Sequence, residues 1–415
     1  MVEYPYWVWL SLALVPGTDT FAKLRASFSS VKKIYRATEA ELVAVLGERK
    51  DGTVKRLMNK SFDRVQRILD FVHTYDIGML VYDDPKFPQC LRDIKNPPAM
   101  LYYKGRFPRF ERSFYVSVVG SREHSDYTKR MAFELGYDLA RGGTTLVSGM
   151  AKGLDSIAMA GALKAGGNVI GVLGSGIDII YPKEHVYLSK VIESHGVIVT
   201  EYPPGTPPYG SNFPIRNRII SALGNAVLVI GGRDQSGSLI TADIAKAQGR
   251  PLYALPGNVD DPYCAASDIL LREGALPALC ADDILVHFKP KFPYSIWLER
   301  LMPVSKYDVE EELDKLKVCY TRSERPAVVE PKVEIQPDAI FDQAYEERAI
   351  RQTIINSLSV DERAIYDRVP VGDGVYLDEV VDETYSPQFV FSTLTMLELK
   401  GLLKQVPGGR FAKIE

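Results

Sequence analysis

The residues of this chain best suited to chemistry are small residues and cations that follow short apolar runs. One run ends in Gly120-Ser121-Arg122, and another ends in Ser148-Gly149-Met150-Ala151-Lys152-Gly153. Glycine lets a backbone come close to an anion, and the first N–H groups of a following helix point at it. Similar endings recur at 174–176, 231–233 and 256–257. One glycine-rich turn needs no explanation beyond folding, but five of them, with cations nearby, predict a phosphate-lined crevice.

A second candidate is the segment 212–220, which reads Asn-Phe-Pro-Ile-Arg-Asn-Arg-Ile-Ile. Phe213 could stack on an unpaired base, and Arg216, Asn217 and Arg218 could contact phosphate. The alternative is that Phe213 is a buried anchor and the arginines cap the next helix. We favour nucleic-acid contact, because single-stranded nucleic acid requires this combination of aromatic and guanidinium groups. Residues of a similar kind begin a later helix: Gly237, Ser238 and Thr241.

The signatures of several enzyme classes are missing from the sequence. There is no GxGxxG after the first strand and no GxxxxGK[ST], which disfavours nicotinamide, flavin and P-loop ATP sites. The five histidines and four cysteines show no metal-ligand or disulfide spacing. Asp155, Asp178 and Glu201 could reach the crevice, although roles at helix starts fit their positions at least as well. We expect no catalytic residue, no metal and no cofactor.

The apolar runs predict the fold that positions these residues. Six runs alternate with helix-length segments, at 114–119, 145–147, 169–173, 197–199, 226–230 and 252–255. Continuous apolar strands are typical of a parallel sheet covered by helices on both faces. The prediction is an α/β chain with an extended, Rossmann-like parallel sheet. Ligands bind such sheets at the carboxyl ends of the strands, where the glycine-rich segments fall.

The flanks differ from this core. Residues 1–75 have helical periodicity and predict a small module of the SAM or helix-hairpin-helix kind. Its tight turn at 14–18 could meet a DNA phosphate, but Asp19 beside it favours plain packing. We expect the Rossmann-like core and its lead-in at 76–290, a linker at 291–350, and a winged-helix domain of three helices and two strands at 351–415.

The charge of the last domain bears on its role. Residues 361–415 hold ten acidic and six basic side chains, a local net charge of −4. Its third helix has no Arg or Lys before Lys400. A winged helix that reads duplex DNA needs cations against the phosphates. We therefore expect a protein-interaction or dimerisation surface here.

Composition narrows the class of protein. The chain has 415 residues, of which 46% are hydrophobic and 25% charged, as in ordinary soluble multi-domain proteins. Its net charge is −3, so nucleic-acid binding must come from a local patch. The apolar run at 7–15 is too short to span a bilayer and follows no basic residue. We expect a cytoplasmic protein.

Taken together, the motifs resemble the DprA/Smf family of DNA-processing proteins. Six of them stand in that family's order: Val-Val-Gly-Ser-Arg at 118–122, Ser-Gly-Met-Ala-Lys-Gly-Leu-Asp at 148–155, Tyr181-Pro182, Phe-Pro-Ile-Arg-Asn-Arg-Ile-Ile at 213–220, Ser-Gly-Ser-Leu-Ile-Thr-Ala at 236–242, and Pro256-Gly257. Each motif is short, but their order and spacing across about 170 residues are specific. The flanks also resemble those of the family.

The resemblance implies a core that binds single-stranded DNA and loads a RecA-type recombinase onto it during natural transformation and homologous recombination, often as a homodimer. It assigns phosphate contacts to Gly120, Ser121, Arg122, Gly149 and Lys152. It assigns the path of the strand to Phe213, Arg216, Asn217 and Arg218.

Three departures from the family pattern leave residue roles open. The usual histidine is Met159, the acidic residue after the fifth strand is Gly231, and the usual Gly-x-Asn-x-Leu-Ile reads Ala-Ala-Ser-Asp-Ile-Leu at 265–270.

An enzyme remains the alternative. Related Rossmann-like phosphoribohydrolases bind a nucleotide at the same rim and carry a Pro-Gly-Gly-x-Gly-Thr-x-x-Glu loop. The nearest segment here, 231–238, has Gly-Gly but no matching glutamate, and Asp243 is only a distant substitute. A small-nucleotide sensor is a third reading.

Overall fold

The structure is a computed structural model. It describes residues 3–47, 52–108, 110, 113–301 and 309–320, and, nearer the C-terminus, 358, 360–370, 374–381, 385, 387–399, 402–406 and 410–413. The chain divides into two compact units, 1–325 and 326–415. Most of the predicted linker, 302–308 and 321–350, lies outside the described residues, so the predicted domain boundaries stay predictions.

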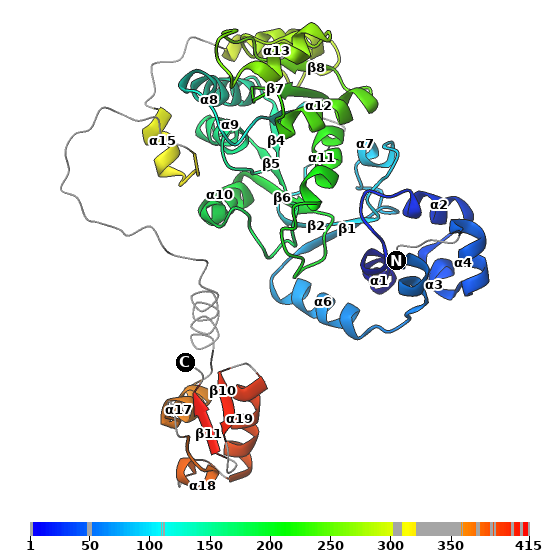
Figure 1. Cartoon of the computed structure of the whole chain (residues 1–415), viewed down its shortest axis with the longest axis vertical. Helices are drawn as coiled ribbons and strands as arrows, with labels where there is room; N and C mark the ends of the chain where they lie inside the picture. The colour runs from blue at the N-terminus through cyan, green and yellow to red at the C-terminus, as the bar shows by residue number, and fades with distance from the viewer. Residues whose placement is uncertain are drawn as a thin grey trace, which may run out of the picture. The chain divides into compact units, whose positions relative to one another are not determined.

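A nine-stranded sheet forms the centre of the first unit (Figure 1). The strand order is β1-β2-β6-β5-β4-β3-β7-β8-β9. The run β6-β5-β4-β3-β7-β8-β9 is parallel, and β1 and β2 add an antiparallel edge next to β6. The strands are β1 (Gly78–Val81), β2 (Met100–Gly105), β3 (Tyr115–Val119), β4 (Thr145–Ser148), β5 (Val169–Val172), β6 (Gly196–Thr200), β7 (Ala226–Val229), β8 (Leu252–Ala254) and β9 (Leu276–Pro277). β3 to β8 are the six predicted strands, which confirms the predicted α/β fold with a largely parallel sheet.

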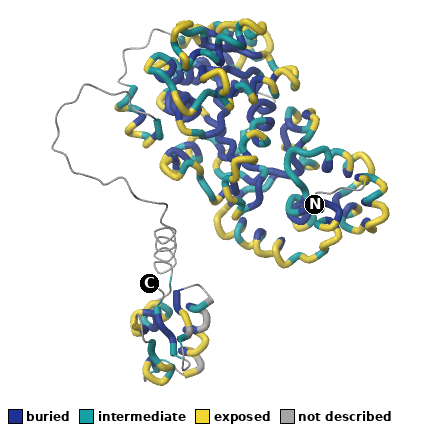
Figure 2. The backbone as a smooth tube through the Cα atoms, in the orientation of Figure 1, coloured by how far each residue is buried: buried dark blue, intermediate teal, exposed yellow. Residues whose placement is uncertain are grey.

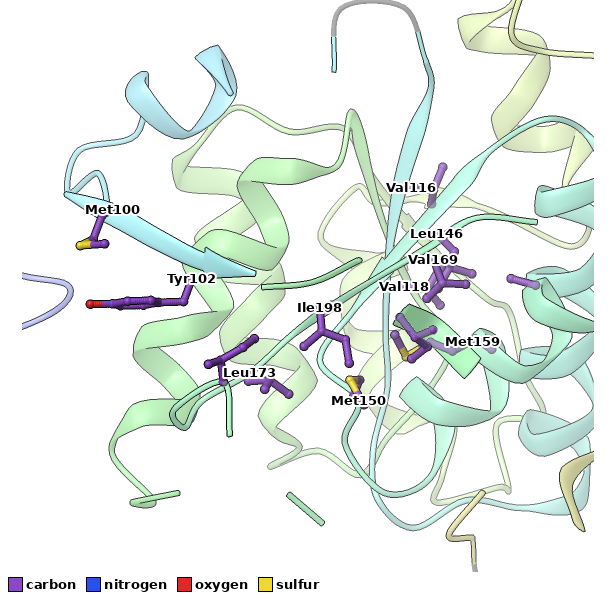
Figure 3. Packing of buried hydrophobic residues seen from close by; sticks show 14 of the residues in the cluster. Met100, Tyr102, Val116, Val118, Leu146, Met150, Met159, Val169, Leu173 and Ile198 are labelled. Carbon is purple, nitrogen blue, oxygen red and sulfur yellow. The ribbon is translucent and has the colours of Figure 1, made fainter. Parts of the chain in front are cut away.

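Helices cover both faces of the sheet, so its central strands are buried throughout (Figure 2). Val116 and Val118 of β3 pack into one core with Leu146 and Val169 (Figure 3), whereas Tyr115 belongs to the core on the opposite face. The first core is closed by α8 (Asp126–Arg141), α9 (Leu154–Lys164), α10 (Val186–His195) and α14 (Asp282–Phe288). The second is closed by α7 (Gln89–Arg92), α11 (Asn212–Leu223), α12 (Gly237–Ala247) and α13 (Ala265–Arg272).

Helices α8 and α9 approach each other unusually closely, and glycines make this possible. A Cβ on Gly136 would lie 2.1 Å from the Ala158 carbonyl oxygen, and one on Gly161 would lie 2.1 Å from that of Phe133. The next inward-facing residue, Met159, is fully buried in the core beside this contact (Figure 3). Met159, which departs from the family pattern, is therefore a core residue and does not line the crevice described below. The departure at 265–270 forms most of α13.

The N-terminal part is helical and packs on the sheet unit. Its helices are α1 (Tyr4–Ala13), α2 (Thr20–Ser27), α3 (Val31–Arg36), α4 (Glu39–Leu46), α5 (Thr53–Met58) and α6 (Asp63–Thr74). The turn between α1 and α2 faces inward: the Gly17 carbonyl accepts a hydrogen bond from Asn96 Nδ2 (2.7 Å), and a Cβ on Gly17 would lie 2.8 Å from the side chain of Ile215 on α11. This turn is used for packing, as the sequence favoured.

Two short elements close the described part of the first unit after the sheet. These are a 3-10 turn, η2 (Leu298–Arg300), and α15 (Val309–Lys315). A further 3-10 turn, η1 (Lys183–His185), precedes α10.

The second unit holds α17 (Val360–Arg368), α18 (Leu377–Val380), α19 (Pro387–Leu399) and the antiparallel pair β10 (Leu403–Val406) and β11 (Arg410–Lys413). Ile365, Val390, Leu394 and Phe411 form its own small core. Three helices followed by two strands match the predicted order of elements, and the winged-helix assignment stays a prediction. None of the helices among the described residues is long and apolar enough to cross a membrane.

Candidate nucleic-acid interface

The strand order creates a crevice at the carboxyl ends of β3 and β7. After β3 the chain moves outward through β4, β5 and β6, and then returns to place β7 on the other side of β3. The loops after β3 and β7 therefore diverge, which is where parallel α/β sheets bind ligands. A cavity of about 760 Å³ lies here. The predicted residues in its lining are Gly120, Ser121, Arg122, Phe213, Arg216, Asn217, Gly237, Ser238 and Thr241.

The loop after β3 forms one wall of this crevice. The Ser121 N–H donates to the Gly231 carbonyl after β7 (3.1 Å), and the Ser121 carbonyl accepts from the Leu154 N–H at the start of α9 (3.1 Å). Ser121 Oγ donates to the Glu123 carbonyl. These bonds fix the loop so that Arg122 stands exposed at the rim. Arg122 makes no hydrogen bond or ion pair with any other residue that the structure describes, so its guanidinium is available to an anion.

Asp155 holds two strand ends together behind that wall. Its carboxylate accepts hydrogen bonds from the Gly120 N–H (3.0 Å) and the Gly149 N–H (3.2 Å), which follow β3 and β4. Burial raises the pKa of this carboxyl, and the charge of Arg216 and the hydrogen bonds oppose the shift. The sequence left open whether Asp155 reaches the crevice or serves the helix start. It lies in the lining but is engaged by backbone groups.

Arg216 is buried beneath the floor of the crevice. Its Nη1 donates to the carbonyls of Gly149 (2.8 Å) and Val172, at the ends of β4 and β5, and its Nε donates to Asn217 Oδ1 (3.2 Å). Burial lowers the pKa of this guanidinium to about 10, with Asp155 acting in the opposite direction. A Cβ on Gly149 would lie 2.7 Å from Arg216 Nη2, so this glycine makes room for the guanidinium. Arg216 thus ties strand ends together while one surface of it lines the cavity.

Two aromatic rings form one end of the crevice. Phe213 is half-buried against Gly174, where a Cβ would lie 3.0 Å from its ring. Tyr181 follows β5 and lies with its ring centroid 5.5 Å from that of Phe213, at an interplanar angle of 48°. Tyr181 is 41% exposed, so it offers a free ring surface. Phe213 is therefore both an anchor on the β5 loop and part of the lining, and Tyr181 is a site residue that the sequence named only within a family motif.

The start of α12 forms the facing wall. Its N-cap, Ser236, accepts a hydrogen bond from the Ser238 N–H (3.3 Å), and Ser238 Oγ lies 2.9 Å from Ser236 Oγ. A Cβ on Gly237 would meet no atom within 4 Å, so the backbone here faces open space. Arg233 stands on the same side, but it is paired with Glu123 (3.1 Å) and lies over the Tyr263 ring. The sequence had not named Arg233 as a site residue, although it follows the Gly231-Gly232 turn.

Five predicted residues lie outside the lining: Ser148, Gly149, Lys152, Gly153 and Arg218. Ser148 is buried and its hydroxyl donates to the Val118 carbonyl (2.6 Å). Arg218 is buried on the other side of α11, where its Nη2 contacts both carboxylate oxygens of Glu201 (2.8 and 2.7 Å). Burial raises the pKa of Glu201, and Arg218 opposes that shift. Their predicted contacts with DNA are not tested by this geometry and stay predictions.

Lys152 and Gly153 lie just past the rim formed by Arg122. Lys152 is exposed, and the structure gives its ammonium group no hydrogen bond or ion pair among the described residues. The Gly153 N–H is already occupied, since it donates to the Cys319 carbonyl (3.1 Å). Among the described residues, no group of three or more His, Cys, Asp and Glu side chains is placed to hold a metal ion.

Comparison with known proteins identifies the family. A model of the DNA recombination-mediator protein A family matches residues 78–289. The DNA processing protein DprA of Bacillus subtilis is 35% identical over 235 residues, which cover 57% of this chain and 79% of that protein. Protein Smf of Synechocystis sp. is 32% identical over 286 residues, covering 68% and 72%.

A solved structure agrees with the sequence matches. The X-ray structure of DNA processing protein A from Streptococcus pneumoniae superposes with a TM-score of 0.56 at 29% identity, covering 65% of this chain and 97% of that one. The family match extends over half of the chain, and it coincides with the sheet and the crevice-forming loops. The chain therefore belongs to the DNA recombination-mediator protein A family, as its DprA/Smf motifs predicted.

Proposed function

We propose that this protein binds single-stranded DNA in the crevice between the β3 and β7 loops and presents it to a RecA-type recombinase. The observation that carries the proposal is the pairing of an unengaged cation with an exposed aromatic surface in one cavity. Arg122 stands at the rim and Tyr181 at the end beside Phe213. A guanidinium attracts phosphate, and a ring accepts any base by stacking, so such a site binds single strands with little sequence preference.

The walls of the crevice suit a phosphate backbone. The helix start at Ser236-Gly237-Ser238 combines backbone N–H groups with hydroxyls, and the positive end of α12 favours an anion there. The open space above Gly237 lets a phosphate approach the backbone closely. We infer that the strand passes between this helix start and Arg122, with a base against Tyr181.

A binding role fits the crevice better than a catalytic one. Asp155 is engaged by two backbone N–H groups, and Glu123 is paired with Arg233. The remaining carboxylate of the lining, Asp234, stands exposed on the β7 loop. We therefore propose a mediator that needs neither a catalytic residue nor a cofactor.

The other parts of the chain receive matching roles. We propose that the N-terminal module braces the sheet unit and that the C-terminal unit is a winged-helix domain for protein contacts. A cytoplasmic homodimer is the expected form. Leu276 of β9, Leu279 just after it and Val286 of α14 are exposed, which supports an apolar contact between two copies. The recombinase partner rests on membership of the family.

The proposal is tested by fluorescence anisotropy of a labelled oligo-dT with purified protein, with unlabelled duplex as competitor. Arg122→Ala should weaken binding by about tenfold, because it removes a charge-assisted contact with phosphate. Arg130→Ala is the matched control, since Arg130 is an exposed arginine on α8 whose nearest ion-pair partner, Glu134, is 3.9 Å away. Equal loss in the two variants would show general electrostatic attraction and contradict the assigned site.

A second pair of variants tests stacking. Tyr181→Ala should weaken binding by about 1–3 kcal/mol, the usual contribution of one stacked base. Tyr294→Ala is the control, because Tyr294 is 92% exposed and lies outside the crevice lining. Unchanged affinity in Tyr181→Ala would remove the aromatic end of the crevice from the DNA path.

A further inference from the structure

Residues 309–320 pack against the sheet unit beside the crevice, and we call them the strap. The strap consists of α15 and the residues that follow it up to Tyr320. Leu313 is fully buried and Val318 nearly so, which seats the strap in the same hydrophobic core as α8 and α9. Figure 1 shows α15 next to these helices.

Two lysines of the sheet unit hold the acidic face of the strap. Lys129 Nζ on α8 lies 3.0 Å from Glu310 Oε1, and Lys164 Nζ on α9 lies 2.9 Å from Glu312 Oε2. The Lys129 side chain is only 6% exposed, so its pair with Glu310 is shielded from solvent. The carboxylates of Glu310 and Glu312 thus bind the two lysines as the anionic groups of an acidic polymer would.

The end of the strap is fixed by its backbone. The Cys319 N–H donates to His185 Nε2 (2.9 Å), and the Cys319 carbonyl accepts from the Gly153 N–H (3.1 Å). His185 is fully buried, and its Nδ1 lies 3.0 Å from the Met150 carbonyl, which fixes the tautomer that leaves Nε2 as the acceptor. The strap is therefore held by specific bonds at both ends.

The Cys319 carbonyl stands where an anion would bind. Gly153 caps α9, and its N–H points out of the positive end of that helix. A Cβ on Gly153 would lie 2.5 Å from the Arg122 carbonyl oxygen, so this position adjoins the crevice rim. Lys152 is exposed beside it, and its charge lowers the pKa of the Cys319 thiol, although burial raises that pKa overall.

We propose that the strap is autoinhibitory: it competes with DNA phosphates for the Gly153 N–H beside Lys152, and a strand that extends past Arg122 must lift it. This inference rests on the proposed function and adds a regulatory step to the same site. A short oligonucleotide confined to the crevice binds without moving the strap, whereas a longer one displaces residues 309–320. Any factor that draws the strap away raises the affinity for DNA.

The first test weakens the seat of the strap in the full-length protein. Glu310→Gln with Glu312→Gln removes the ion pairs with Lys129 and Lys164, along with the pair of Glu312 with Lys315 inside the strap, and should tighten binding of a long oligo-dT by about three- to tenfold. Glu299→Gln with Glu311→Gln is the matched control: it changes the net charge equally, but Glu299 and Glu311 are exposed and Glu311 pairs with Lys315 of the same helix. Equal effects of the two double variants would overturn the inference.

Hydrogen exchange provides the second test and separates the two hypotheses. Saturating the wild-type protein with long oligo-dT should speed amide exchange in 309–320 while slowing it around 120–122. DNA binding with unchanged amide exchange in 309–320 would overturn the autoinhibitory role of the strap and leave the proposed function intact. If neither the wild type nor the Glu310/Glu312 variant binds DNA, the proposed function fails and the strap fails with it. Binding by that variant alone would support the strap.

Discussion

At the scale of single residues, the crevice is shaped from behind by two buried charges. Asp155 accepts hydrogen bonds from the N–H groups that follow β3 and β4. Arg216 donates hydrogen bonds to carbonyls at the ends of β4 and β5. Strand ends carry backbone groups without ladder partners, and leaving them unsatisfied in the interior is costly. These two side chains satisfy them, so their first role is structural.

Asp155→Asn should therefore destabilise the protein, by roughly 3 kcal/mol, the typical cost of breaking a buried charged network. The amide of asparagine replaces one acceptor with a donor that faces a backbone N–H. Urea denaturation followed by circular dichroism measures the change. Asp234→Asn is the control, since Asp234 is an exposed carboxylate of the same cavity and should leave stability unchanged. Equal stability of Asp155→Asn and the wild type would contradict this role.

The sequence predicts which residue types gather at the crevice but not which way each one points. Arg216 and Arg218 are two positions apart on α11, and residues two apart on a helix do not share a face. One of them therefore had to turn away, and Arg218 faces Glu201 instead. Helical geometry could have separated the pair, but only the fold shows that Glu201, at the end of β6, is the partner.

At the scale of elements, the contact between α8 and α9 sets the position of the β4 loop. Two helices can approach this closely only where side chains are absent, and Gly136 and Gly161 supply that space. The start of α9 carries Asp155, so a shift of this helix would move the crevice wall.

Gly161→Ala should cost about 1–3 kcal/mol of stability, because the new methyl group overpacks a tight contact with the Phe133 carbonyl. Thermal unfolding measures the loss. Gly237→Ala is a helical control whose Cβ meets no atom within 4 Å, so it should not lower the melting temperature. Equal melting temperatures for Gly161→Ala and the wild type would show that α8 and α9 can separate without penalty.

The link between η1 and the strap should make stability depend on pH. Burial lowers the pKa of His185 below its ordinary value of 6.5, while the Met150 carbonyl and Glu184 oppose the shift. The unfolded chain then binds a proton more readily than the folded one, so this stability is fully present above pH 6.5 and is lost as the pH falls below it.

Urea denaturation between pH 7.5 and pH 5 checks this dependence. His185→Gln should flatten the curve, whereas His195→Gln, which changes an exposed histidine, should not. Parallel curves for His185→Gln and the wild type would count against the assigned linkage.

Element prediction from sequence succeeded where strands are apolar throughout. β3 to β8 are buried on both faces, which produces an unambiguous apolar run. β9 is only two residues long and exposed, so it has no pattern to detect. The strap could not be predicted either, because its acidic helix looks like part of a polar linker until Lys129 and Lys164 are placed opposite it.

At the scale of the whole molecule, few cations at the crevice remain available for DNA. Arg216 is buried, and Arg218 and Arg233 are paired with carboxylates, which leaves Arg122 and Lys152. The chain carries a net charge of −3, so no general positive field adds to them. Under the proposed function, we therefore expect stacking on Tyr181 to supply a large share of the affinity.

The salt dependence of binding should consequently be modest. Two phosphate contacts on a single strand give a log–log slope of about −1.4, or about a sevenfold loss of affinity between 50 and 200 mM salt. Anisotropy titrations of oligo-dT across this range measure the slope. A slope several times steeper would show that cations elsewhere in the chain also contact the strand.

The packing of the N-terminal module on the sheet unit affects how the protein unfolds on heating. Trp7 and Leu10 of α1 belong to the same continuous hydrophobic core as Val116 of β3 and Met150 of the loop after β4, whereas the C-terminal unit has a core of its own. A continuous core melts cooperatively, so we expect the module and the crevice to unfold in one transition and the C-terminal unit in another. If the crevice binds DNA as proposed, the temperature at which the strand is released depends partly on the buried tryptophans of α1, Trp7 and Trp9.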